Sequence, residues 1–182
     1  MRNFNGFAGL AGILLLLIIV TGCAPTVVYT STPEVRIAEN ALFQARLEPV
    51  KQGGGFFTLM RLTLTNRSKN ALEVGWNQTR YIHDGEIKGG VVFKGVRPAD
   101  VKNNDIPPDL VPPGAVLTKD LAPIKLIAYA PYKSGKVAFG ESGVSAGLLP
   151  VGENGILLIY RYQGQMLQQK ITLKIKAKTQ GK

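Results

Sequence analysis

The sequence predicts an all-β domain, an antiparallel β-sandwich, and three observations carry that prediction. Short segments alternate apolar and polar residues with the period of two that a half-buried strand requires. Clusters of Gly, Asn, Asp and Pro separate these segments, as turns do. Seven or more such strands, with hairpin turns and one long crossover loop, are typical of a sandwich rather than of a parallel sheet.

The amino-terminal segment has the layout of a secretory signal peptide. Arg2 gives a positive start, and an apolar stretch broken only by glycine covers residues 7–20. As a helix this stretch reaches about 21 Å, which is less than the roughly 30 Å of a hydrocarbon core. A buried helix of a cytosolic domain is the alternative, but no polar face interrupts the run. We therefore expect residues 1–22 to direct export and then to be removed.

The end of this segment, Val20-Thr21-Gly22-Cys23, resembles the lipobox of bacterial lipoproteins at all four positions. The resemblance implies that Cys23 receives a diacylglyceryl group and becomes the acylated first residue of the mature chain. Each buried methylene contributes about 0.8 kcal/mol, so two or three acyl chains would make the attachment effectively permanent. Ala24 follows, where Asp often retains such proteins at the inner membrane. The resemblance thus implies an outer-membrane location, facing the periplasm.

After the signal peptide, we expect a tether over residues 23–33 and one folded domain over residues 34–182. The tether is rich in small, β-branched and Pro residues and has no amphipathic period. Cys23 is the only cysteine, so no internal disulfide is predicted. The formal net charge of +10 favours an anionic partner. Export argues against nucleic acid and for envelope anions; a basic surface that only keeps the domain soluble is an equal alternative.

In chain order, the first strands are predicted at residues 42–48 and 56–66, on either side of a Gly53-Gly54-Gly55 turn. A polar turn follows, and then Leu72, Val74 and Trp76 share one strand face. This phase makes Trp76 a core residue rather than an exposed platform for stacking a sugar.

The sharpest local pattern is a hairpin with Asp84-Gly85 at its tip, between strands at residues 81–83 and 86–87. A type I′ turn needs positive φ at both central residues, and Asp-Gly suits it. The strand pattern continues over residues 91–96. Five prolines then predict a long, stiff loop over residues 97–114, which excludes a central strand or a helix interior there.

The last part of the chain should begin with short strands at residues 115–119 and 124–130. We predict irregular structure over residues 131–155 and a final strand pair at residues 156–162 and 166–178. No helix is predicted inside the domain.

The final strand carries a stripe of lysines on one face, opposite Ile171, Leu173 and Ile175. Its members are Lys170, Lys174, Lys176 and Lys178. Neighbours two residues apart lie about 7 Å from one another on a strand, and no acidic residue follows Glu153 in the sequence. We predict that this lysine stripe binds an anionic envelope surface. The alternative is that lysines on an edge strand only block aggregation.

Two stretches resemble parts of immunoglobulin-like domains in periplasmic lipoproteins. They are TLTNRSKNALEVGWNQTRYIHDGE, residues 63–86, and the Pro-Pro-Gly turn in VPPGAVLTKD, residues 111–120. The resemblance implies an immunoglobulin-like sandwich that binds or scaffolds, without the Cys-Trp-Cys pattern of antibody domains. Size and layout are also similar to small outer-membrane lipoproteins of type VI secretion systems. An accessory role in a secretion or conjugation assembly is therefore the alternative.

Residues with catalytic or metal-binding chemistry are few. Gly143-Val144-Ser145-Ala146-Gly147 matches the nucleophile elbow of α/β-hydrolases, which needs a helix after the serine. Pro150 and Gly152 discourage that helix, so a serine hydrolase using Ser145 is a remote alternative. His83 has no second His or free Cys for a metal site, and we expect it to face solvent.

A group of oxygen-bearing residues in the Pro-rich loop lacks the spacing of a calcium loop. Its members are Asp100, Asn103, Asn104, Asp105 and Asp109. We therefore predict no catalytic residue, no metal and no cofactor. The expected partners are the membrane, through the lipid anchor, and either anionic envelope components or another envelope protein.

Overall fold

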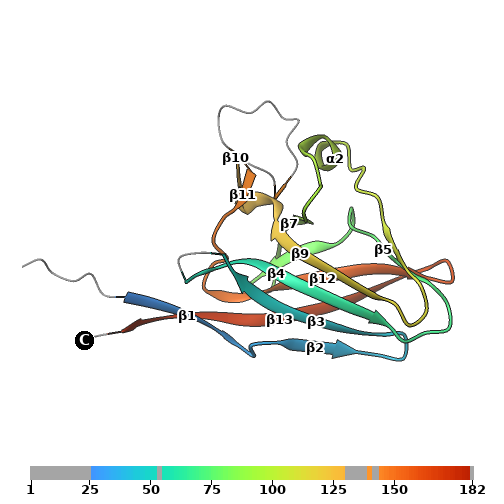
Figure 1. Ribbon diagram of the computed structural model, residues 1–182, viewed down its shortest axis with the longest axis horizontal. Coiled ribbons are helices and arrows are strands. Elements are labelled where there is room, and N and C mark those ends of the chain that lie inside the picture. The colour runs from blue at the N-terminus through green and yellow to red at the C-terminus, as the bar shows by residue number, and fades with distance from the viewer. Residues whose placement is uncertain (1–25, 53–54, 130–138, 141–143, 181–182) are drawn as a thin grey trace, which may run out of the picture. The chain divides into compact units, whose positions relative to one another are not determined.

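The computed structural model describes residues 26–52, 55–129, 139–140 and 144–180 (Figure 1). One compact unit spans Val28–Lys178 and contains the fold discussed below. A second unit joins Met1–Val27 to Thr179–Lys182. Only the outer ends of two strands belong to the described part of that second unit. The predicted signal peptide and Cys23 lie outside the described residues.

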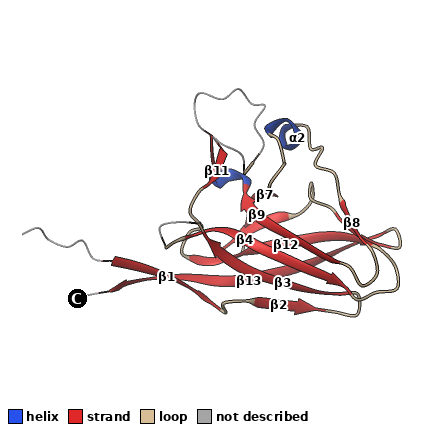
Figure 2. Cartoon of the chain, in the orientation of Figure 1, coloured by secondary structure: helices blue, strands red, loops and turns tan. Residues whose placement is uncertain are grey.

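Strands dominate the described chain, and its helical segments are short (Figure 2). The helical segments are α2 (Pro98–Lys102) and the 3-10 helix η1 (Ile124–Leu126). The strands are β1 (Thr26–Thr32), β2 (Arg36–Glu39), β3 (Phe43–Lys51), β4 (Phe57–Asn66), β5 (Leu72–Val74), β6 (Arg80–His83), β7 (Glu86–Val92), β8 (Asp109–Val111), β9 (Val116–Pro123), β10 (Ile127–Tyr129), β11 (Val144–Ala146), β12 (Gly152–Tyr162) and β13 (Gln165–Gln180). The prediction of an all-β domain is confirmed.

The larger sheet is antiparallel and curls on itself. Its strand order is β1-β13-β12-β6-β7-β9-β4-β3-β2, with β5 between β12 and β8. Strand β9 joins the two halves of the curl, because Val116 to Leu121 pair with β4 whereas Ala122 and Pro123 pair with β7. A separate pair, β10 and β11, stands outside this sheet.

The core lies between the two halves of the curled sheet. Phe43 of β3 meets Tyr160 of β12 edge to face, with ring centroids 4.9 Å apart, and Figure 1 shows β3 and β4 crossing over β12 and β13. Along β4 the buried Leu62 and Leu64 alternate with half-buried neighbours, as period two predicts. Burial of each such leucine stabilises the fold by about 1.5–3 kcal/mol. Trp76 is also core, with 1% of its surface exposed, as predicted.

The hairpin prediction is confirmed in detail. Strands β6 and β7 pair around Asp84-Gly85, and both turn residues have positive φ, 47° and 81°. This is the backbone that a type I′ turn requires. Strand β7 ends at Val92, so the expected continuation to Val96 is wrong.

The Pro-rich segment is not one continuous loop, and the prediction that the domain contains no helix is wrong. Helix α2 forms within it, because Pro98 occupies the first helical turn, where its missing N–H has no partner to lose. Strand β8 also forms there, pairing with β5. Its three residues lie between two Pro-Pro pairs, so the prolines bound the strand without interrupting it.

The ends of other elements also differ from expectation. Residues predicted as a tether form β1, which is the neighbour of β13 in the sheet, so the ordered strands begin before Glu34. The stretch predicted as irregular contains β11 and the start of β12. Period-two patterns define the middle of a strand better than its ends, since pairing continues wherever a neighbouring strand offers hydrogen bonds.

Candidate functional site

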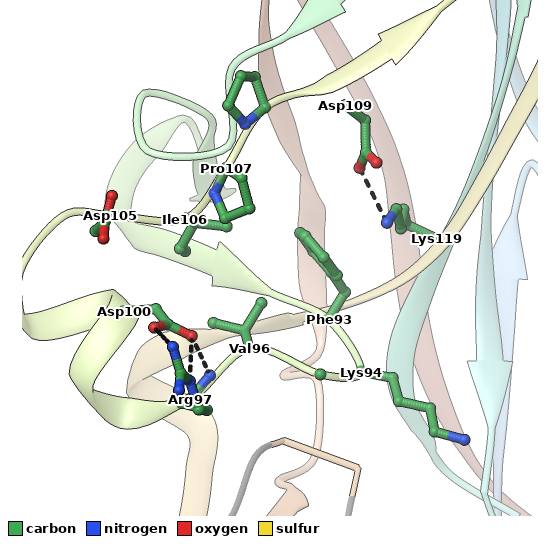
Figure 3. A pocket seen from close by; sticks show the side chains of 12 residues that line it. Phe93, Lys94, Val96, Arg97, Asp100, Asp105, Ile106, Pro107, Asp109 and Lys119 are labelled. Carbon is green, nitrogen blue, oxygen red and sulfur yellow. Dashed lines mark hydrogen bonds and ion pairs between the residues drawn. The ribbon is translucent and has the colours of Figure 1, made fainter.

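A cavity of about 610 Å³ lies beside helix α2, and we call it the α2 cavity (Figure 3). It is built from the loop after β7, from α2, from the segment that leads into β8, and from β9. Its lining residues are Phe93, Lys94, Gly95, Val96, Arg97, Asp100, Asp105, Ile106, Pro107, Pro108, Asp109 and Lys119. The loop, the helix and the two strand segments, all within residues 93–119, therefore share one concave surface.

One end of the cavity is formed by the first turn of α2. Asp100 lies in the first turn, and its Oδ2 accepts a hydrogen bond of 2.9 Å from the Arg97 backbone N–H. The Arg97 guanidinium also binds this carboxylate, with Nη2 to Oδ1 at 2.8 Å. These contacts hold the pKa of Asp100 below its ordinary value, and the hydrogen bond from the Arg97 side chain has the largest effect. The charged carboxylate thus caps a helix whose first residue is Pro98.

The other end of the cavity combines an aromatic pair with a half-buried ion pair. Trp76 packs against Phe93 with ring centroids 4.9 Å apart, and the indole Nε1 donates to Asp109 Oδ2 at 2.7 Å. Lys119 Nζ lies 2.9 Å from the same oxygen and 4.3 Å from the Phe93 ring centroid. An ammonium over an aromatic face is stabilised by about 0.5–2 kcal/mol, more as water is excluded. Figure 3 shows Phe93, Asp109 and Lys119 at one end of the cavity and the Arg97–Asp100 pair at the other.

The chemistry of the α2 cavity suits recognition of a ligand with both apolar and polar parts. Its walls are apolar where Val96 and Ile106 are buried, and it offers three acidic and three basic side chains. Two of the carboxylates are already bound by cations. None of the lining residues in the described part is a Ser, Thr, Cys, His or Tyr. Mixed apolar and polar walls of this kind are usual in binding pockets.

Ser145 lies elsewhere, exposed on the short strand β11. It lines a smaller cavity of about 290 Å³ with residues that include Gln52 and Leu59. Residues 147–151 contain no helix and lead directly into β12, so the strand-to-helix turn of a nucleophile elbow is not formed. Gly143, the first glycine of the motif, lies outside the described residues.

His83 does not face solvent as predicted. Only 20% of its side chain is exposed, and Nε2 lies 3.3 Å from Asp84 Oδ2. Its Nδ1 lies 3.0 Å from the Glu153 carbonyl oxygen, so the ring helps to hold the hairpin tip against the start of β12. The expectation was wrong because sequence gives no view of what packs over a turn.

Two of the three acidic residues of the Pro-rich segment bind cations of the chain itself. Asp100 binds Arg97 and Asp109 binds Lys119. Across the described ranges, no group of three or more His, Cys, Asp or Glu side chains gathers in a way that could hold a metal ion. The carboxylates of Asp100 and Asp109 are thus engaged in ion pairs within the chain.

The lysine stripe lies on the exposed face of β13, and all four lysines are exposed. Lys170 is not a free charge, because its Nζ lies 3.5 Å from Glu153 Oε1. That contact was missed because Glu153 precedes Lys170 by a whole strand, and only the β12–β13 pairing brings the two together. Binding of an anionic surface by the stripe stays a prediction.

Comparison with known proteins gives no further guide to the site, since the chain matches no protein-family model, no curated protein and no solved structure. Within the described residues, no helix has both the length and the apolar character needed to cross a membrane.

Proposed function

We propose that this chain is a lipid-anchored lipoprotein of the bacterial envelope whose β domain acts by binding rather than by catalysis. The observation that carries the proposal is the tetrapeptide Val20-Thr21-Gly22-Cys23, placed directly after a short apolar run with a basic start. In this proposal Cys23 is the lipidated first residue of the mature chain. The mature chain is held at the outer membrane and faces the periplasm.

The proposal gives the β domain an immunoglobulin-like sandwich architecture. The contact between Phe43 and Tyr160 across the two halves of the curled sheet supports this finer description. So does the exchange of β9 between β4 and β7, because a strand that pairs with both halves is a common way to close a sandwich.

Within the domain, the α2 cavity is the proposed ligand site. It combines apolar walls with the paired charges of Lys119 and Asp109, and its volume is in the range of small-molecule pockets. A ligand there would place an apolar group against Phe93 and Ile106 and polar groups near the two ion pairs. Envelope location and a preformed pocket together favour binding or scaffolding.

The test of lipidation is metabolic labelling with a fatty-acid analogue in a bacterial host. The wild-type chain should carry the label, and Cys23→Ser should not, because the serine hydroxyl does not replace the thiol as acceptor. Ser145→Ala is the matched control and should be labelled like the wild type. Equal labelling of Cys23→Ser and wild type would refute the proposal.

A further inference from the structure

A second cavity, of about 550 Å³, brings together two cations from distant strands, and we call it the Arg36–Lys174 cavity. Arg36 begins β2 and Lys174 lies in β13. The lining is completed by Thr32, Pro33, Asp84, Gly152, Glu153, Thr172 and Leu173. The side chains of the lining thus include a guanidinium, an ammonium and two threonine hydroxyls, all of which can donate hydrogen bonds.

The two acidic residues of this lining are engaged by other groups. Asp84 Oδ1 accepts a hydrogen bond of 2.7 Å from the Glu153 backbone N–H, and Asp84 Oδ2 lies 3.3 Å from His83 Nε2. The carboxylate of Glu153 lies 3.5 Å from Lys170. Both carboxylates of the lining therefore already have partners, and that of Glu153 is paired with a cation outside the cavity.

The two cations, in contrast, have no carboxylate partner among the described residues. In the described residues, no ion pair includes Arg36 or Lys174. Lys174 is directly opposite Glu153 in the β12–β13 register, but the carboxylate contact is made by Lys170. Exposed Lys176 and Lys178 continue the positive charge along the same strand.

The shape of the cavity depends on a close backbone approach. Gly152 has φ of 123°, and a Cβ there would come within 2.5 Å of Asp84 Oδ1 and 2.9 Å of His83 Cε1. Only glycine allows the hairpin tip to sit this close to the start of β12. This approach holds Asp84 against the start of β12, while Arg36 and Lys174 lie on separate elements.

We propose that the Arg36–Lys174 cavity binds a phosphate group, carried by a lipid headgroup or by a free phosphate. Guanidinium groups bind phosphate oxygens in pairs, and an ammonium adds a point charge. The threonine hydroxyls supply neutral donors to the remaining oxygens. The lipid source rests on the proposed function, because the anchor on Cys23 would hold the domain beside a bilayer and raise the effective concentration of headgroups.

The test uses the full-length chain in a non-ionic detergent and titrates it with inorganic phosphate by calorimetry at low and moderate salt. Arg36→Gln and Lys174→Gln should each weaken binding by about tenfold or more, as loss of a charge-assisted hydrogen bond does. Glu153→Gln should tighten binding, because it removes a negative charge from the lining. A damaged fold would not produce tighter binding, so this variant keeps the test informative.

Lys176→Gln is the matched control, since it removes an exposed lysine of the same strand that does not line the cavity. It should change phosphate affinity by less than about twofold. If all three basic variants weaken binding equally, a diffuse positive surface explains it and the proposal fails. It also fails if the wild-type chain binds neither phosphate nor anionic vesicles at low salt.

Vesicles identify the source of the phosphate. The chain is mixed with phosphatidylcholine vesicles that contain or lack phosphatidic acid, whose headgroup is a phosphate monoester. Retention on phosphatidic acid that depends on Arg36 and Lys174 supports the site and assigns it to lipid. Binding of inorganic phosphate without such retention supports the site and assigns it to a free phosphate. Labelling of Cys23 is independent of both results, so failure of the lipoprotein proposal is recognised separately.

Discussion

Asn154 is a buried polar side chain that fixes the start of β12. It has no exposed surface, and its amide nitrogen donates to the carbonyl oxygens of Pro150, at 2.8 Å, and Gly152, at 3.1 Å. Its side-chain oxygen accepts from the Tyr81 hydroxyl of β6. Burial, with a smaller effect of the Asp84 charge, raises the pKa of Tyr81 well above its ordinary value, so the phenol stays a donor.

Tyr81→Phe should destabilise the fold by about 1–3 kcal/mol, because it leaves the buried oxygen of Asn154 without a donor. Urea denaturation followed by circular dichroism measures the change in the free energy of unfolding. Tyr162→Phe is the matched control, since that hydroxyl accepts only an exposed contact from Asn70, and surface changes usually stay within about 0.5 kcal/mol. Equal losses in the two variants would contradict the role of Asn154.

At the scale of single residues, the sequence predicted which apolar side chains are buried and not which polar ones are paired. The phase of Leu72, Val74 and Trp76 was enough to place the indole in the core. The partner of that indole, Asp109, lies 33 residues further along the chain. No local pattern links the two, because the hydrogen bond exists only after β8 pairs with β5.

At the scale of elements, helix α2 depends on one carboxylate. Asp100 accepts from the backbone N–H and from the guanidinium of Arg97, and this side-chain contact lowers its pKa. A carboxyl with a lowered pKa in the folded state contributes stability at pH values above its unfolded pKa. That contribution is lost as the pH falls through the folded pKa.

We therefore expect the start of α2 to loosen in acid before the rest of the domain unfolds. Nuclear magnetic resonance should show the Asp100 carboxyl titrating below the ordinary aspartate range, with the Arg97 amide signal moving at the same midpoint. In Asp100→Asn the Arg97 signal should lose this pH dependence. A titration midpoint at or above the ordinary value would contradict the capping contact.

The sequence predicted those elements that are specified by neighbouring residues and missed those that are too short to show a pattern. Asp84-Gly85 specifies its hairpin locally, since both residues accept positive φ. Helix α2 is too short to show a 3.6-residue period, and the prolines around it pointed to a loop. The α2 cavity was also missed, because Phe93, Ile106 and Lys119 of its lining come from separate segments that no local pattern connects.

At the scale of the whole molecule, the antiparallel all-β class followed from the sequence, but the strand order did not. Strand β9 pairs with β4 along most of its length and with β7 at its end. Because β9 pairs with both strands, the two halves form one curled sheet. The alternation of apolar and polar residues in β9 does not indicate which strands it pairs with. Arg36 and Lys174 line one cavity although they are 138 positions apart, as their numbers show, and β1, which precedes Arg36, is the neighbour of β13.

The formal net charge of +10 has a structural counterpart in this arrangement. Many basic residues are matched by acids across strands, as Arg61 is by Asp120 at 2.7 Å. Exposed pairs of this kind contribute little to stability, about 0–1 kcal/mol. The basic residues without such partners in the described residues include Arg36 and Lys174, and also others on separate elements, such as Arg46, Lys51 and Lys125.

The most direct test of the account is the mass of the mature chain extracted from bacterial membranes, with its amino-terminal peptide sequenced by tandem mass spectrometry. The account predicts that residues 1–22 are absent and that the chain begins at Cys23, with a diacylglyceryl group on Sγ. A chain that retains Arg2 and the apolar run, with an unmodified thiol on Cys23, would contradict it.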